Sequence, residues 1–130
     1  MKHGIASVLF VAAFAVAGCG REPRSPAEVM AGLRSPDPRD RADAAKELRA
    51  HKGPPAEAVP ALFEAIQTEQ DNKAYAEMMI TLAHSGAPQA EPFICAKIYD
   101  ADANMRRWAS QALKTWLPKN RQSKGCPPPQ

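Results

Sequence analysis

The side chains best suited to catalysis or metal binding in this chain are its cysteines, histidines and carboxylates. The sequence holds three Cys, three His and 14 Asp or Glu among 130 residues. Catalysis needs a nucleophile beside a base, a pair of carboxylates or a metal cluster, and no motif of these kinds occurs. His51 and His84 fall in different segments, and no Cys and His spacing suits zinc. The sequence therefore predicts a protein that is not an enzyme and uses no metal or cofactor.

Cys19 has the most specific chemical setting. It follows Ala17 and Gly18, which end an apolar stretch of about thirteen residues that begins at Ile5, after the basic Lys2. A membrane span needs roughly 20 apolar residues, whereas this order of charge, short apolar core and small residues is typical of a secretory signal. With the Cys in place, the segment resembles the signal of a bacterial lipoprotein precursor. An ordinary signal with a chance Cys is the alternative.

The lipoprotein resemblance implies cleavage between Gly18 and Cys19, a diacylglyceryl thioether on the Cys19 sulfur and an acylated amino terminus. Residues 1–18 are then a signal peptide and residues 19–26 a lipidated linker. Each buried methylene adds roughly 0.8 kcal/mol, so two or three acyl chains hold permanently to a membrane. Gly20 follows the Cys where inner-membrane lipoproteins carry Asp, which favours an outer-membrane anchor facing the periplasm. The choice between the two membranes stays open.

Charge is nearly balanced over the chain but uneven along it. Removal of residues 1–18 leaves 16 basic and 14 acidic residues, which argues against nucleic acid as a partner. Residues 19–102 hold ten Lys or Arg and all 14 acids, whereas residues 103–130 hold six basic residues and no acid. One end of the molecule is therefore basic.

Cys95 and Cys126 remain when Cys19 is lipidated. Thiols pair in an oxidising compartment, and closing a loop of about 30 residues stabilises a fold by roughly 3 kcal/mol in the chain-entropy model. We predict a Cys95–Cys126 disulfide, which would tie the Pro-rich basic tail of residues 118–130 to the last repeat. A buried Cys95 with a free Cys126 is the alternative.

Between residues 27 and 117 the chain repeats one short pattern three times. In each copy an Asp is followed by side chains at spacings of four, three and four, which fall on one face of a helix. The three sets are Asp37, Arg41, Ala44 and Leu48; Asp71, Tyr75, Met78 and Leu82; and Asp102, Arg106, Ala109 and Leu113. An apolar pair precedes each set, and no segment alternates as a strand would. The pattern predicts three hairpins of two helices, with each Asp at the start of a second helix.

The repeat length is 34 and then 31 residues between the aligned leucines, which is typical of helical solenoids. The segments DANMRRWASQAL (102–113) and VPALFEAI (59–66) resemble HEAT repeats, in particular the short variety of the bilin-lyase type. The resemblance implies an all-α superhelix of about three hairpins over residues 27–117. Asp40 and Tyr75 depart from the motif, and tetratricopeptide repeats stay as an alternative.

A candidate partner surface lies on the second helices, opposite their aligned apolar positions. Trp and Arg are favoured anchors of protein interfaces. The predicted partner-binding residues are Trp108, Arg107, Lys114 and Gln111 of the third repeat and Ile80 of the second, all expected to face solvent. Trp116 is expected in the core. The alternative for Trp108 is that the tail covers it.

These observations predict a membrane-anchored envelope lipoprotein that acts as a scaffold for another envelope protein. An accessory or inhibitory subunit that docks through the basic end is the second interpretation. A lyase or hydrolase with an unrecognised site is the third. No feature of the sequence names the partner.

Overall fold

The computed structural model describes residues 22–50 and 52–130. The expected signal, the Cys19 lipidation site and His51 lie outside the described residues. The described chain forms six α-helices and two short 3₁₀ turns. The helices are α1 (Pro26–Gly32), α2 (Pro38–Arg49), α3 (Ala58–Thr68), α4 (Asn72–Ser85), α5 (Glu91–Ile98) and α6 (Ala103–Trp116), and the 3₁₀ turns are Pro88–Ala90 and Leu117–Lys119.

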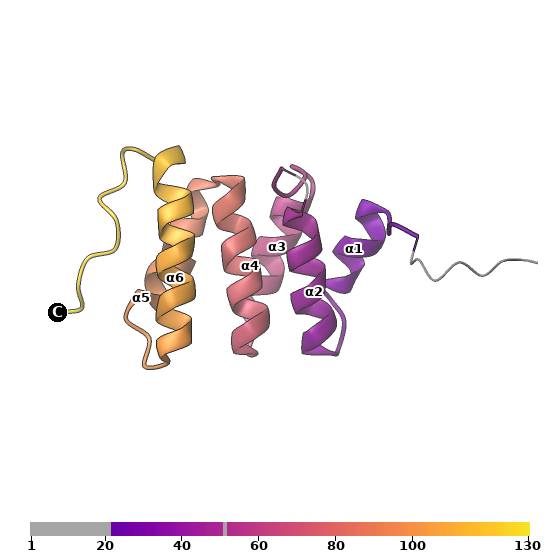
Figure 1. The fold of residues 1–130 in the computed structure, drawn as a ribbon, viewed down its shortest axis with the longest axis horizontal. Coiled ribbons are helices and arrows are strands. Elements are labelled where there is room, and N and C mark those ends of the chain that lie inside the picture. Colours follow the sequence, from indigo (N-terminus) through magenta and orange to yellow (C-terminus); the bar gives the residue numbers. More distant parts are fainter. Residues whose placement is uncertain (1–21, 51) are drawn as a thin grey trace, which may run out of the picture.

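The helices form three hairpins stacked in two layers (Figure 1). Helices α2, α4 and α6 stand side by side in one layer, and α1, α3 and α5 lie behind them. No strand occurs in residues 22–50 and 52–130. The prediction of an all-α solenoid of three helical hairpins is confirmed.

Each second helix begins where its aligned Asp caps it. The Asp37 carboxylate accepts the Arg39 amide at 2.8 Å, Asp71 accepts the Ala74 amide at 2.9 Å and Asp102 accepts the Met105 amide at 2.9 Å. These bonds satisfy backbone donors that a helix leaves unpaired in its first turn. A polar side chain two residues before each Asp accepts the Asp amide in turn. Those side chains are Ser35, Glu69 and Asp100.

The core lies between the layers and is centred on α4. This helix is buried from Ala76 to Ala83 except at Glu77, because α2 and α6 flank it on both sides. Trp116 is 1% exposed, as expected for the core side, and its Nε1 donates to the Ala87 carbonyl at 2.8 Å. The largest fully buried side chains are Trp116, Leu62, Ile66, Met78, Met79, Leu82, Ile94 and Met105.

Polar contacts join consecutive hairpins. The Arg41 guanidinium donates from Nε and NH2 to the Glu69 carboxylate, at 2.7 and 2.9 Å, and so links α2 to the start of the next second helix. At the aligned position of the second repeat, the Tyr75 hydroxyl donates to the Phe93 carbonyl of α5 at 2.9 Å. Tyr75 therefore ties its hairpin to the next one, as Arg41 does, but through a neutral phenol whose pKa burial raises to about 12.

The tail runs from the end of α6 back along α5. Asn120 donates to the Gly86 carbonyl at 3.0 Å, and Ser123 donates to Glu91 at the start of α5 at 2.6 Å. Cys126 is joined to Cys95 of α5 by a disulfide, with an S–S distance of 2.08 Å. None of these contacts involves Trp108, so the tail packs on the α5 side of the last hairpin.

Candidate protein-binding surface

Helix α6 is the second helix of the last hairpin and has a neighbour in its own layer on one side only. Its buried face consists of Met105, Ala109, Ala112 and Trp116, which recur at spacings of three and four. Because residues 117–130 form no further hairpin, much of the remaining helix surface is accessible in the described structure. This position in the stack makes α6 the helix best placed to present side chains to a partner.

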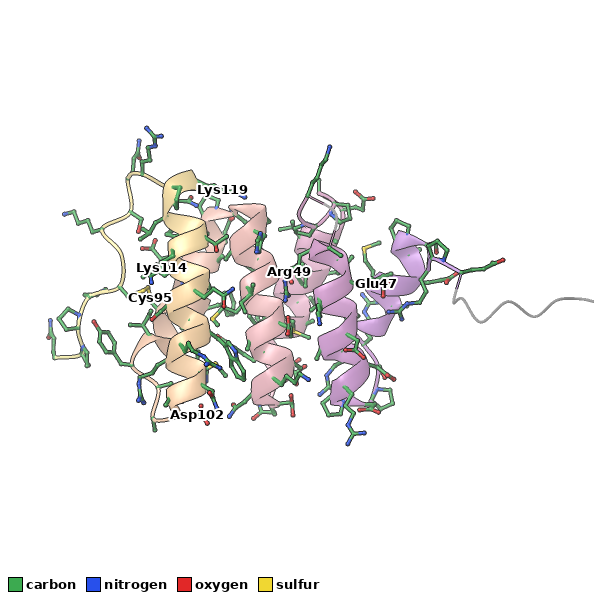
Figure 2. The ribbon with its side chains drawn as sticks, viewed as in Figure 1. Glu47, Arg49, Cys95, Asp102, Lys114 and Lys119 are labelled. Carbon is green, nitrogen blue, oxygen red and sulfur yellow. A yellow bond between two sulfur atoms is a disulfide. The ribbon has the colours of Figure 1, made fainter. Side chains whose placement is uncertain are left out.

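Three of the predicted partner-binding residues lie on that accessible side. Arg107, Gln111 and Lys114 are exposed and are spaced by four and three residues, so they form one stripe along α6. Trp108 is half-buried beside the stripe and packs in part against the core. We call Arg107, Trp108, Gln111 and Lys114 the α6 surface; Lys114 marks its upper part in Figure 2.

Ile80 does not belong to this surface, and the expectation that it faces solvent was wrong. Its side chain is 6% exposed and is part of the core cluster. The sequence alignment treated the three second helices as equivalent, but α4 is the middle helix and has neighbours on both sides. A position that is open on a terminal helix is therefore covered on α4. Trp108 is also less exposed than expected.

The α6 surface has a basic character that no neighbouring acid neutralises. None of the ion pairs formed within residues 22–50 and 52–130 includes a residue of α6. Among the described residues, the side chain of Arg107 makes one long hydrogen bond of 3.4 Å, from Nη2 to the Asn104 side-chain oxygen. Tryptophan and arginine are two of the residue types most enriched at interface hot spots.

Arg106, next to the surface, has a pattern of contacts that the sequence analysis did not recognise. Its NH1 donates to the Asp100 and Ala101 carbonyls at 2.8 and 2.9 Å, as Arg41 NH1 donates to the Ser35 and Pro36 carbonyls at 2.8 and 3.2 Å. Both arginines therefore hold the turn that precedes their helix. Their alignment in the repeat was the available signal for this shared role.

Arg106 differs from Arg41 in one respect. Arg41 also binds Glu69 of the next hairpin through Nε and NH2, whereas Arg106 belongs to the last hairpin and has no carboxylate partner in the described part of the chain. Tyr99, the one large hydrophobic residue of the described segments that is more than half exposed, precedes the same turn. The open end of the solenoid thus presents an aromatic ring and a guanidinium.

The titratable groups that depart from their ordinary pKa have structural explanations. Burial lowers the pKa of His84, and the positive charges of Arg49 and Lys119 lower it further. Burial raises the pKa of Glu69, but the hydrogen bonds from Arg41 and the Asp71 amide outweigh burial and leave it lowered. Neither group has a nucleophile or metal-ligand set beside it. Within residues 22–50 and 52–130, no three His, Cys, Asp or Glu side chains are grouped as metal ligands would be.

One groove of the described structure lies elsewhere, between α1 and α3. It has a volume of about 450 Å³ and is lined by residues that include Met30, Ala61 and the Arg41–Glu69 pair. The charges in this groove already satisfy each other, and the exposed Arg34–Glu64 pair, at 3.5 Å, adds a further tie between its walls. The groove is therefore explained by the short α1 and by contacts between repeats.

No described helix is long and apolar enough to cross a bilayer.

Comparisons with known proteins agree with this architecture. The family model for HEAT repeats matches residues 26–114, which spans all three hairpins up to Lys114. Searches of curated proteins and of solved structures found no match. The residues that the family model matches are those that form the three hairpins of the structure. HEAT repeats generally mediate interactions between proteins. The chain belongs to the HEAT-repeat family.

Proposed function

We propose that this protein is a non-catalytic scaffold that binds another protein of the bacterial envelope through the α6 surface. The observation that carries the proposal is the exposed stripe of Arg107, Gln111 and Lys114 beside the half-buried Trp108. A ring anchored in the core keeps its orientation, so binding does not have to order it first. Tryptophan and arginine are enriched among the few residues that carry most of the binding energy of protein interfaces.

The HEAT-repeat architecture supports a binding role over a catalytic one. Stacked hairpins present extended surfaces, and their stability comes from contacts between neighbouring repeats. The open end of the stack adds Tyr99 and Arg106, which lie at the turn before α6. An acidic segment of a partner fits this end, because a carboxylate bound to Arg106 would repeat the contact of Glu69 with Arg41.

The cellular setting is part of the same proposal. The basic start, apolar core and Cys19 of the sequence support secretion and lipidation, with an outer-membrane anchor facing the periplasm. Cys19 precedes the first residue of α1, Pro26, by seven residues, so the proposed anchor and the first helix are close in sequence. A scaffold held this way works close to the membrane surface, and its partners are envelope proteins.

Quantitative co-purification tests the proposal. The full chain, purified from gently solubilised envelopes, is compared with a variant carrying Arg107→Glu and Lys114→Glu and with a control carrying Arg39→Glu and Lys73→Glu. All four positions are exposed, so the variants should unfold at the temperature of the wild type. A protein that is retained by the wild type and the control but lost by the α6 variant supports the proposal. Identical co-purified proteins in all three would contradict it.

A further inference from the structure

The two edges of the solenoid carry opposite charge. One edge is formed by the connections within the hairpins, residues 33–37, 69–71 and 99–102, which hold five acids and one base. The other is formed by residues 22–25, the connections between hairpins at 52–57 and 86–90, and residues 117–124, which hold two acids and five bases. We call the second group the basic edge. Asp102 and Lys119 mark the two ends of α6 in Figure 2.

The segments of the basic edge are in contact with one another. Lys119 donates to the His84 carbonyl at the end of α4, and Gly53 lies close to the same carbonyl. Asn120 donates to the Gly86 carbonyl at 3.0 Å. Pro23 and Arg24 line a common groove with Gly53 and Pro55. The connections of this edge lie along the upper side of the solenoid in Figure 1, from the first hairpin to the start of the tail.

Side chains, and not helix dipoles, set the potential of this edge. Helices α1, α3 and α5 begin at it and α2, α4 and α6 end at it, so their opposite terminal half-charges largely cancel. Lys52, Arg121 and Lys124 are exposed and take part in no ion pair within the described structure. Of the nearby acids, Glu47 pairs with Arg24, whereas Glu91 accepts the neutral Ser123 hydroxyl and keeps its charge. These three unpaired cations outnumber the two acids of the same edge, Glu22 and Glu57.

The described chain begins at this same edge. Pro23 and Pro26 line the same groove as Gly53 and Pro55, so the segment that precedes Glu22 in sequence connects to the described domain at this edge. Those residues include the apolar stretch 5–17 and Cys19, the two parts of the sequence suited to a membrane. Membrane attachment through either one brings the basic edge next to the lipid headgroups.

We propose that the basic edge docks on anionic phospholipid headgroups and orients the solenoid with its acidic edge away from the membrane. Each basic side chain near an anionic surface raises the ratio of docked to undocked protein roughly fivefold. Salt screens this effect. The cations lie on the side where the chain meets the membrane, which favours lipid over an acidic protein as the occupant. The inference does not require that the α6 surface binds a partner.

Depth-dependent quenching tests the orientation. The full chain is inserted in vesicles of phosphatidylglycerol and phosphatidylethanolamine or of phosphatidylcholine alone, each doped with headgroup spin-labelled lipid. A fluorescent amino acid replaces Gln122 at the basic edge or Asn104 near the acidic edge, both exposed positions. We expect strong quenching at position 122 in the anionic vesicles only, lost between 0.1 and 1 M salt, and weak quenching at position 104 throughout.

Matched variants separate charge from fold. Lys52→Asn with Arg121→Gln and Lys124→Gln should reduce the docked-to-undocked ratio by roughly two orders of magnitude; Asn suits position 52, where φ is 61°. Arg34→Gln with Arg39→Gln and Lys73→Gln removes three cations from the other side and should leave quenching unchanged. Equal quenching at positions 122 and 104, or the same quenching in both kinds of vesicle, overturns the proposal. All variants keep the α6 surface, so partner binding is scored separately.

Discussion

The Arg41 guanidinium and the Glu69 carboxylate form a two-point ion pair between the first and second hairpins, with Nε–Oε2 and NH2–Oε1 distances of 2.7 and 2.9 Å. Glu69 is 2% exposed and also accepts the Asp71 amide. One carboxylate therefore caps the turn of its own repeat and binds the preceding repeat. Because of this double role, the stability of the stack should be sensitive to loss of either partner.

Loss of Arg41 should therefore cost more than loss of Arg106. We expect Arg41→Met to lower the free energy of unfolding by about 2 kcal/mol at pH 7, because the Glu69 charge stays buried without its main partner. Arg106→Met removes the equivalent carbonyl bonds and no ion pair, and should cost less than about 1 kcal/mol. Urea unfolding of both variants measures the difference. Equal losses would show that the ion pair adds nothing.

The same pair should make stability depend on pH. The pKa of Glu69 is lowered in the folded protein, so its contribution is complete above the ordinary value of 4.5 and is lost as pH falls through the folded value. We expect the gap in stability between wild type and Glu69→Gln to shrink below pH 4.5. Urea titrations between pH 3 and 7 check this. A gap that is constant over that range would contradict the assigned shift.

The Asp caps predict a second set of stability changes. Asp71→Ala leaves the Ala74 amide without its side-chain acceptor and should cost about 1 kcal/mol, whereas Asp71→Asn should cost only a few tenths. Asp43→Ala, at an exposed position within α2, serves as the control and should be nearly neutral. Thermal unfolding followed by circular dichroism measures all three. A cost at position 43 equal to that at position 71 would argue against the cap.

The Cys95–Cys126 disulfide makes a prediction about thiol reactivity. In protein purified without reductant and then denatured, neither cysteine should react with a thiol label, and both should react after reduction. Peptide mapping assigns the label and keeps Cys19 apart. Cys126→Ser should lower stability by up to about 3 kcal/mol, since the unfolded chain regains its freedom. Labelling of both positions without reductant would exclude the disulfide from the purified protein.

The two tryptophans should respond differently to the same substitution. Trp116→Phe removes the hydrogen bond from Nε1 to the Ala87 carbonyl and leaves a gap in the core, and should cost about 2 kcal/mol. Trp108→Phe keeps an aromatic ring at a half-buried position and should cost less than about 1 kcal/mol. Chemical unfolding of each variant measures these costs. The opposite order would mean that Trp108 is a core residue, which would remove the anchor of the α6 surface.

The sequence predicted the hairpins because their determinants are local. Asp71 and Asp102 act within three residues of themselves, and the spacing of Ala109 and Trp116 follows the helical period. Burial of Ile80 was missed because it depends on the place of α4 in the stack. A repeat alignment carries no information about which copy is central.

Contacts between repeats were also beyond sequence reasoning. Arg41 and Glu69 are 28 residues apart in the sequence. Taken alone, each looks like an ordinary charged side chain, so the sequence did not indicate that they pair. The alignment of Arg41 with Arg106 was a signal for their shared contacts to the preceding turn, although the sequence analysis did not use it. It did not show that only Arg41 has a following hairpin to supply a carboxylate, because that depends on where the stack ends.

In-cell photocrosslinking from α6 is the most direct test of the protein-binding role. Benzoylphenylalanine replaces Gln111 on the α6 surface or Gln67 on α3, and both positions are exposed but lie in different layers. We predict one discrete adduct with an envelope protein from position 111, absent from position 67 and lost with Arg107→Glu and Lys114→Glu. No adduct from position 111, or the same adducts from both positions, would contradict a binding surface on α6.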